Sequence, residues 1–208
     1  MLYDFSDTSA GQRYFLMTQS IMPRPIAWIL TENPDGSHNL APFSFFTPVC
    51  SNPPTLVVSV GNKEAGIPKD TWANIQRTGH AVVHVPSLRH IDSVNCSAAT
   101  LDAGVSEVVE AGLTTVPLQT VAGDEYPLPR IDGVDVAYGC RYQQHVDLGE
   151  APQHIVFLEV EHLYVADEVL VEVKDRKQIG ADELNPLSRL GGADYAVIGD
   201  KHSRARPD

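Results

Sequence analysis

The sequence predicts a mainly β protein with a few short helices, arranged as a closed antiparallel barrel. Two long strand-like runs, at 134–146 and 154–165, are separated by a turn late in the chain. An earlier stretch at 26–46 resembles a hairpin, with Asp35-Gly36 at the turn, where a positive φ is required. Because strands and helices do not alternate regularly, an open doubly wound sheet is not expected.

The N-terminal part supplies a helix and the hairpin. A short helix is expected within residues 6–20, capped by Ser6 or Thr8, with its aromatic side chains packed on another surface. The run 26–31 is β-prone and forms the first arm of the hairpin. The return arm, 39–46, contains Pro42, which cannot donate to a ladder, so this arm should lie at a sheet edge or break into a loop.

The remaining elements follow from β-branched runs, caps and glycines. Further strands are expected at 55–60, 80–85, 134–146 and 154–165. Further helices are expected at about 70–78, 88–99 and 106–111. Residues 113–133 hold several prolines and glycines and are interpreted as an irregular connection. In the last long strand, alternation places His162 on one face with Val156, Leu158 and Val160.

Length and composition limit the class of protein. The 208 residues, 43% of them hydrophobic, fit a single domain, 1–208, with a barrel core at about 20–170 and a C-terminal extension at about 171–208. A net charge of −12 argues against nucleic-acid binding. No run approaches the roughly 20 apolar residues of a membrane span, and the N-terminus lacks a signal-peptide pattern, so a cytoplasmic location is expected.

The cysteines and histidines predict no metal site. Cys50, Cys96 and Cys140 are widely spaced and odd in number, so reduced thiols in or near the core are expected rather than disulfides or a zinc knuckle. His80 and His84 share a strand face, but no spacing supplies further ligands. They are interpreted as structural or surface residues.

Two local patterns could bind an anion. At Lys69-Asp70-Thr71 a loop enters a helix, where free N–H groups, the helix dipole, the lysine and the threonine hydroxyl could hold a phosphate. An ordinary capped helix explains the same triplet. Arg189 precedes Gly191-Gly192 and could offer a planar donor to phosphate or carboxylate, or could simply lie in a turn.

No self-contained catalytic motif is present. The chain lacks a serine nucleophile elbow, a zinc-protease helix and a Walker loop. This absence fits a protein whose chemistry is supplied by a cofactor. The arm 39–46, with aromatic and hydroxyl residues around Pro42, could hold a planar ligand with a polar tail, and backbone groups at Ala41 and Phe43 could turn toward it.

Several segments together resemble the flavin reductase-like family of FMN-binding split barrels. They are Pro23-Arg24-Pro25-Ile26-Ala27-Trp28, Asn39-Leu40-Ala41-Pro42-Phe43-Ser44-Phe45-Phe46, Lys69-Asp70-Thr71 with Asn74, Glu110-Ala111-Gly112-Leu113-Thr114, and Pro186-Leu187-Ser188-Arg189-Leu190-Gly191-Gly192. Their order and spacing, over about residues 20–195, carry the resemblance.

The resemblance implies a six-stranded antiparallel Greek-key-like barrel, a homodimer, and one FMN per subunit near the dimer interface. The arm 39–46 would lie along the flavin, with Asn39 at the polar edge of the ring and Ser44 reaching toward the ribityl phosphate. The implied cofactor-binding residues are Asn39, Ala41, Ser44, Phe45, Lys69, Asp70, Thr71 and Arg189. His162 is the candidate catalytic residue and lies either near the ring or in the core.

The leading functional hypothesis is an NAD(P)H-dependent flavin reductase. It would pass hydride from NADH or NADPH to FMN and deliver reduced flavin to a partner oxygenase or another acceptor. The alternatives are a flavoredoxin-like electron carrier without efficient NAD(P)H turnover, and a flavin-binding barrel with no redox activity. No nucleotide-specificity motif separates NADH from NADPH.

Overall fold

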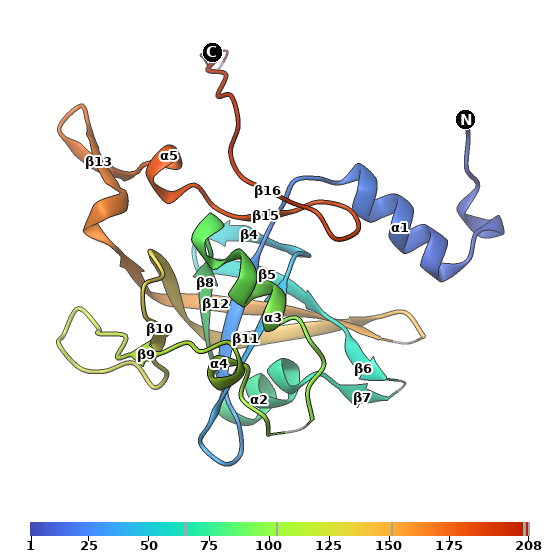
Figure 1. The fold of residues 1–208 in the computed structure, drawn as a ribbon, viewed down its shortest axis with the longest axis horizontal. Coiled ribbons are helices and arrows are strands. Elements are labelled where there is room, and N and C mark those ends of the chain that lie inside the picture. The colour runs from blue at the N-terminus through green and yellow to red at the C-terminus, as the bar shows by residue number, and fades with distance from the viewer. Residues whose placement is uncertain (65, 103, 151, 206, 208) are drawn as a thin grey trace.

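The fold is built around one seven-stranded antiparallel sheet, in the order β3-β2-β8-β11-β12-β5-β4 (Figure 1). The computed structural model describes residues 1–208 except 65, 103, 151, 206 and 208. The strands of the sheet are β2 (Ala27–Glu32), β3 (His38–Phe43), β4 (Phe46–Ser51), β5 (Pro54–Val60), β8 (His80–Val85), β11 (Val136–Leu148) and β12 (Gln153–Val165). The predicted hairpin, long C-terminal pair and antiparallel sheet are therefore confirmed.

The sheet curves so that residues from its two ends pack into one core. Ile29 of β2 and Phe43 of β3 belong to the same buried cluster as Val58 of β5, although β3 is the first strand in the order and β5 is the sixth. The helix α2 (Asp70–Thr78) adds Trp72 and Ile75 to this cluster. Burial of these side chains stabilises the curved sheet because it removes a large apolar area from water.

A second core lies on the other face of the sheet. Trp28 and Val82 project from the sheet into it, and Val94 and Val108 cover them from α3 (Ile91–Cys96) and α4 (Glu107–Glu110). The indole Nε1–H of Trp28 donates to Ser97 Oγ at 2.8 Å, which fixes the segment after α3 against the sheet. This segment later forms one wall of the candidate site.

Short elements surround the sheet. The paired ones are β1 (Arg24–Pro25), β15 (Ser188–Arg189) and β16 (Tyr195–Ala196); β6 (Asn62–Glu64) and β7 (Ile67–Pro68); β9 (Thr115–Val116) and β10 (Arg130–Ile131); and β13 (Leu170–Val173) and β14 (Arg176–Ile179). The helical ones are η1 (Phe5–Asp7), α1 (Ala10–Ser20), η2 (Leu88–His90), η3 (Asp167–Val169) and α5 (Ala181–Leu184). Among the described residues, no helix has the length and apolar character that a membrane span requires.

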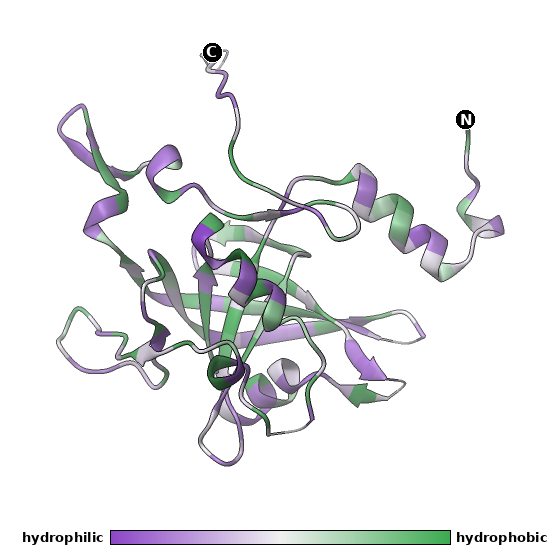
Figure 2. Ribbon diagram, viewed as in Figure 1, coloured by the Kyte–Doolittle hydropathy of each residue, from purple (hydrophilic) through white to green (hydrophobic). Residues whose placement is uncertain are grey.

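The N-terminal helix stands apart from the sheet (Figure 1), and it carries several hydrophobic residues, which are green in Figure 2. Ser9, rather than Ser6 or Thr8, caps α1 by accepting from Gln12 N. Tyr14 is 59% exposed and Phe15 is 52% exposed. Within the described residues, the predicted packing of this helix is therefore only partial: Thr18 is buried, but the aromatic side chains stay largely exposed.

Other differences have local causes. Residues 46–51 form an additional edge strand, β4, although Pro48 lies within it, because a register shift accommodates the interruption. The helix expected at 88–99 ends at Cys96. Cys140 is buried as expected, but Cys50 and Cys96 are exposed.

The face of β12 changes at a bulge. A register shift against β11 leaves Glu161 as an extra residue between Val160 and His162. Val160 packs on the first core, the one that contains Trp72. Tyr164 packs on the second core, on the other face of the sheet, which is called the outer face below. The strict alternation that placed His162 with Val156 and Leu158 is therefore wrong beyond the bulge.

Candidate functional site

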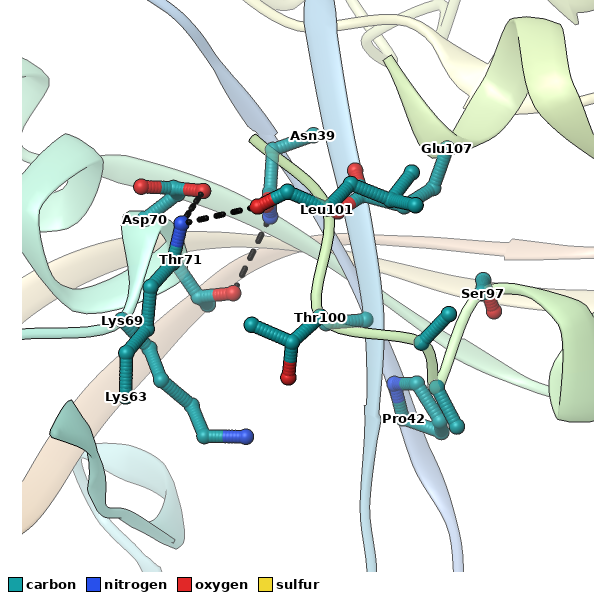
Figure 3. Close-up of a pocket in the computed structure, with 13 residues that line it drawn as sticks. Asn39, Pro42, Lys63, Lys69, Asp70, Thr71, Ser97, Thr100, Leu101 and Glu107 are labelled. Carbon is teal, nitrogen blue, oxygen red and sulfur yellow. Dashed lines mark hydrogen bonds and ion pairs between the residues drawn. The ribbon is translucent and has the colours of Figure 1, made fainter. Parts of the chain in front are cut away.

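An open cleft lies beside β3, between the N-terminus of α2 and the segment 97–101 (Figure 3). It continues into two further compartments, because the first and second share Pro42 and Ala98, and the second and third share Ser44. The three compartments follow the sequence from Asn39 to Phe46. This is the arm that the sequence predicts to hold a planar ligand.

The first compartment contains the N-terminus of α2. Lys69 is the N-cap residue of the helix, and among the described residues no side-chain capping hydrogen bond is made there. The Lys69 ammonium lies 5.8 Å from the centre of the Phe43 ring and, within the described part of the chain, forms no ion pair with a carboxylate. Uncapped N–H groups, the positive end of the helix dipole and this cation together favour an anion.

Two carboxylates in the same compartment are already engaged. Asp70 pairs with Lys63 at 2.6 Å, and the Lys63 ammonium also reaches the Leu101 carbonyl at 3.4 Å. Glu107 is buried, which raises the pKa of its carboxyl, and it accepts from Leu40 N–H at 3.0 Å. Asp70 balances the charge of Lys63, so of the two lysines that line this compartment, Lys69 is the one with no ion pair to another described residue.

A buried amide network fixes the threonine at the start of α2. Asn39 Nδ2 donates to Thr71 Oγ1 at 3.0 Å and lies 3.3 Å from Thr31 Oγ1. Because Thr71 Oγ1 accepts from Asn39, its own hydroxyl hydrogen remains able to donate toward the cleft. Asn39 therefore contributes to the cleft indirectly, because its hydrogen bond orients the Thr71 hydroxyl.

One half of the β3 edge is covered and the other half is open. Ser106 Oγ donates to the His38 carbonyl at 2.5 Å, and Glu107 accepts from Leu40 N–H, so α4 and its preceding residue close the first half. Along β3, every second residue directs its backbone groups away from β2, and Pro42 is the next such residue after Leu40. Pro42 has no N–H to offer at this open edge. By the same alternation, the backbone of Ala41 points to β2, which differs from the expectation that it turns to a ligand.

The second compartment combines an apolar floor with a polar rim. Ile26 and Phe43 contribute apolar surface, and Ser44, Arg189 and Tyr195 stand at the rim. The Arg189 guanidinium stacks 4.4 Å from the centre of the Tyr195 ring and donates to the Gly192 carbonyl at 2.6 Å. This arrangement leaves other guanidinium N–H groups for an anionic or carbonyl group of a ligand.

The third compartment is mostly apolar and lies on the side of α1. Met17 and Ile21 line it together with Phe45 and Phe46. Phe45 is 39% exposed and faces Tyr14, with the ring centres 6.1 Å apart. Its side chain therefore belongs to an exposed aromatic surface shared with α1.

The structure brings most, but not all, of the predicted residues together. Asn39, Ala41, Lys69, Asp70 and Thr71 line the first compartment. Ser44 and Arg189 line the second. The resemblance implies that both Ser44 and Lys69 reach the phosphate, and in the structure they line different, adjoining compartments.

His162 lies outside all three compartments. Its ring packs against Tyr126, with centres 5.5 Å apart, on the outer face of the sheet. Lys63 and Glu107 line the first compartment and had no signal in the sequence, because only the fold brings 62–64 and 107–110 to β3. Arg24 did have a signal, since it lies in the quoted Pro-Arg-Pro segment, but its contacts could not be foreseen.

Comparison with known proteins identifies the family. The family model described as "Flavin reductase like domain" matches residues 18–179. The chain belongs to this family. Of the three residues at the rim of the second compartment, Ser44 lies within the matched residues, whereas Arg189 and Tyr195 lie beyond them.

Relatives of this flavin reductase-like chain agree with the assignment. It is 34% identical to an uncharacterized protein from Halalkalibacterium halodurans, over 96% of this chain and 93% of that one. It is similar to the crystal structure of nitrilotriacetate monooxygenase component B from Bacillus cereus (TM-score 0.87, 30% identity, 98% of each chain). It is also similar to Pseudomonas fluorescens 2-nitrobenzoate 2-nitroreductase NbaA (TM-score 0.85, 28% identity, 100% and 96% of the chains).

Proposed function

We propose that this protein binds FMN in the cleft along β3 and reduces it with NADH or NADPH, as an NAD(P)H-dependent flavin reductase. The observation that carries the proposal is the anion site at the N-terminus of α2, placed beside the open half of an edge strand. An uncapped helix with Lys69 and Thr71 fits a phosphate monoester. The floor of Ile26, Pro42 and Phe43 fits a flat ring.

Each part of the cleft has a task in this proposal. Lys69, Thr71 and the first turn of α2 bind the phosphate. The stretch 41–44 orients the ring and keeps water from one of its faces. Bound FMN would accept a hydride from a nicotinamide and hold the electrons for an acceptor. The residues at the rim of the second compartment leave an opening through which a donor can approach.

His162 is not included in this proposal. Its position against Tyr126, on the outer face of the sheet, is that of a packed core-edge residue. Protein positioning and electrostatics are sufficient for flavin reduction when the cofactor supplies the chemistry, so no reacting side chain is required.

The proposal extends to the assembly of the protein. We propose a homodimer in which the exposed aromatic face of α1 and the third compartment are covered by a second copy, because Tyr14, Phe15, Phe45 and Ile21 leave apolar area in water. We also propose that reduced flavin passes to a partner oxygenase. The similarity to a protein named as component B of a monooxygenase supports this destination.

The test begins with flavin binding. The purified protein is titrated with FMN, and quenching of flavin fluorescence gives the affinity. It is then mixed under argon with NADH or NADPH, and loss of the flavin absorbance near 450 nm is followed, a band typical of oxidised flavin. Rapid bleaching with one nucleotide is expected.

Two outcomes would overturn parts of the proposal. Failure to bind FMN would remove both the reductase and the electron carrier. Binding of FMN, with bleaching by dithionite but by neither nucleotide, would replace the reductase with a flavoredoxin-like carrier.

A further inference from the structure

Arg24 is a buried arginine whose charge is satisfied without a carboxylate. Its side chain lies in the interior next to the cleft, and the residue is 6% exposed. Within the described part of the chain, it takes part in no ion pair, although Arg77, Arg89 and Arg141 do. A buried charge is costly unless hydrogen bonds replace its hydration, so the acceptors around Arg24 decide its role.

Two of those acceptors belong to the C-terminal end of α1. Arg24 Nη1 donates to the Thr18 carbonyl at 2.5 Å and to the Ile21 carbonyl at 2.9 Å. The last carbonyls of a helix carry the negative end of its dipole, so they are suited to a cation. α1 therefore anchors the guanidinium from one side.

The other two acceptors belong to two separate segments, each of which forms a wall of the second compartment. Arg24 Nε donates to Ser44 Oγ at 3.3 Å, and Nη2 donates to the Leu190 carbonyl at 2.9 Å. Ser44 lies in the arm along β3, whereas Leu190 directly follows Arg189, which stands at the rim of the second compartment. β1 also pairs Arg24 with Arg189 in the strand register. One guanidinium thus connects both walls.

The donation to Ser44 sets the direction of its hydroxyl. An oxygen that accepts from a guanidinium keeps its own hydrogen for another acceptor. Ser44 borders the second compartment, so that hydrogen is available to a ligand there.

We propose that Arg24 is a positioning residue for the flavin cleft: it orients the Ser44 hydroxyl toward the ligand and holds residues 188–191 in place as a second wall. The inference rests on the proposed binding of FMN. Lysine retains the charge at this position but lacks the planar fork that reaches Ser44 and Leu190 together.

The first experiment compares Arg24→Lys with Arg13→Lys, which alters an exposed arginine of α1. FMN affinity is measured by fluorescence quenching. Arg24→Lys should weaken binding about tenfold, whereas Arg13→Lys should match the wild type. Ser44→Ala should weaken FMN binding about threefold in the wild-type background and should cause no further weakening in the Arg24→Lys background. Equal losses from Ser44→Ala in both backgrounds would overturn the proposed orientation.

The second experiment uses the protein without FMN. Hydrogen exchange at the amides of residues 188–191 should be about tenfold faster in Arg24→Lys than in Arg13→Lys. Unchanged exchange would overturn the proposed hold on this wall. Because this measurement needs no flavin, failure of the wild type to bind FMN would refute the proposed function separately.

A third variant moves the wall without altering Arg24. A Cβ at Gly191 would lie 2.6 Å from Gln19 Cγ and 3.4 Å from Gln19 Cα, so Gly191→Ala crowds the contact between this segment and α1. Gly199→Ala meets no atom within 4 Å and is the matched control. Gly191→Ala should weaken FMN binding at least about threefold relative to Gly199→Ala. Equal affinities, in a Gly191→Ala protein whose amides at 188–191 exchange faster than those of Gly199→Ala, would contradict the role of this wall, even if Arg24→Lys does not fold.

Discussion

Replacement of Lys69 by alanine tests the anion site at the start of α2. Lys69 forms no ion pair within the described residues, and its contact with the Phe43 ring, 5.8 Å away, is worth about 0.5 kcal/mol at such a site. The folded state should therefore lose little stability. A hydrogen bond to a charged group is worth about 1.5–3 kcal/mol, which corresponds to a loss of roughly tenfold to 150-fold in FMN affinity.

Riboflavin provides the matched ligand, because it carries the same ring and ribityl chain without the phosphate. Fluorescence titrations of Lys69→Ala should show weaker binding of FMN and unchanged binding of riboflavin. Lys177→Ala, which alters an exposed lysine of β14, is the matched protein control and should bind both ligands as the wild type does. Equal losses for FMN and riboflavin in Lys69→Ala, or no loss for either, would refute the phosphate assignment.

Further predictions concern charge, acidity and assembly. Glu107→Gln keeps an acceptor for Leu40 N–H but removes a buried negative charge, so FMN should bind roughly threefold to tenfold more tightly at pH 7; unchanged affinity would place the phosphate elsewhere. Burial lowers the pKa of His84 from 6.5 to about 4, so as the pH falls the unfolded chain binds a proton before the folded chain does. The free energy of unfolding, measured by denaturant titration, should therefore decrease by up to about 3 kcal/mol between pH 6.5 and about pH 4. His84→Gln should lack this part of the loss; an identical pH profile would contradict it. Phe15→Glu should convert a dimer into a monomer in light scattering, whereas Gln12→Glu should not; a monomeric wild type would contradict the assembly.

The strands were predictable because local pattern and tertiary environment agree there. The strand expected at 134–146 appears as β11 at Val136–Leu148, and the β-branched run at 55–60 and the turn before Gly36 appear where expected. Pro42 also predicted its own environment, because β3 is an edge strand. By contrast, the bulge at Glu161 leaves no local signal, and it moved His162 to the outer face of the sheet.

The candidate site was predictable only in part. Lys69 and Thr71 could be predicted as site candidates because a helix start is recognisable from a few consecutive residues. Glu107 and Lys63 were missed because each reaches the compartment from a separate segment, and proximity in space has no local pattern. Asn39 was found, but its task differs: its amide is buried and holds Thr71 in place rather than facing the polar edge of a ring.

The sequence by itself determined the fold class, the antiparallel hairpins, the helix start at Asp70 and, through five dispersed segments, the flavin reductase-like family. These features depend on residue period, turn chemistry and caps, which act over a few neighbouring residues. Only the tertiary structure decided which residues share the cleft and which charges are already balanced. Arg24 shows the reason: its four acceptors lie 3 to 166 residues away in the chain, so their meeting depends on how α1, β3 and the C-terminal segment pack.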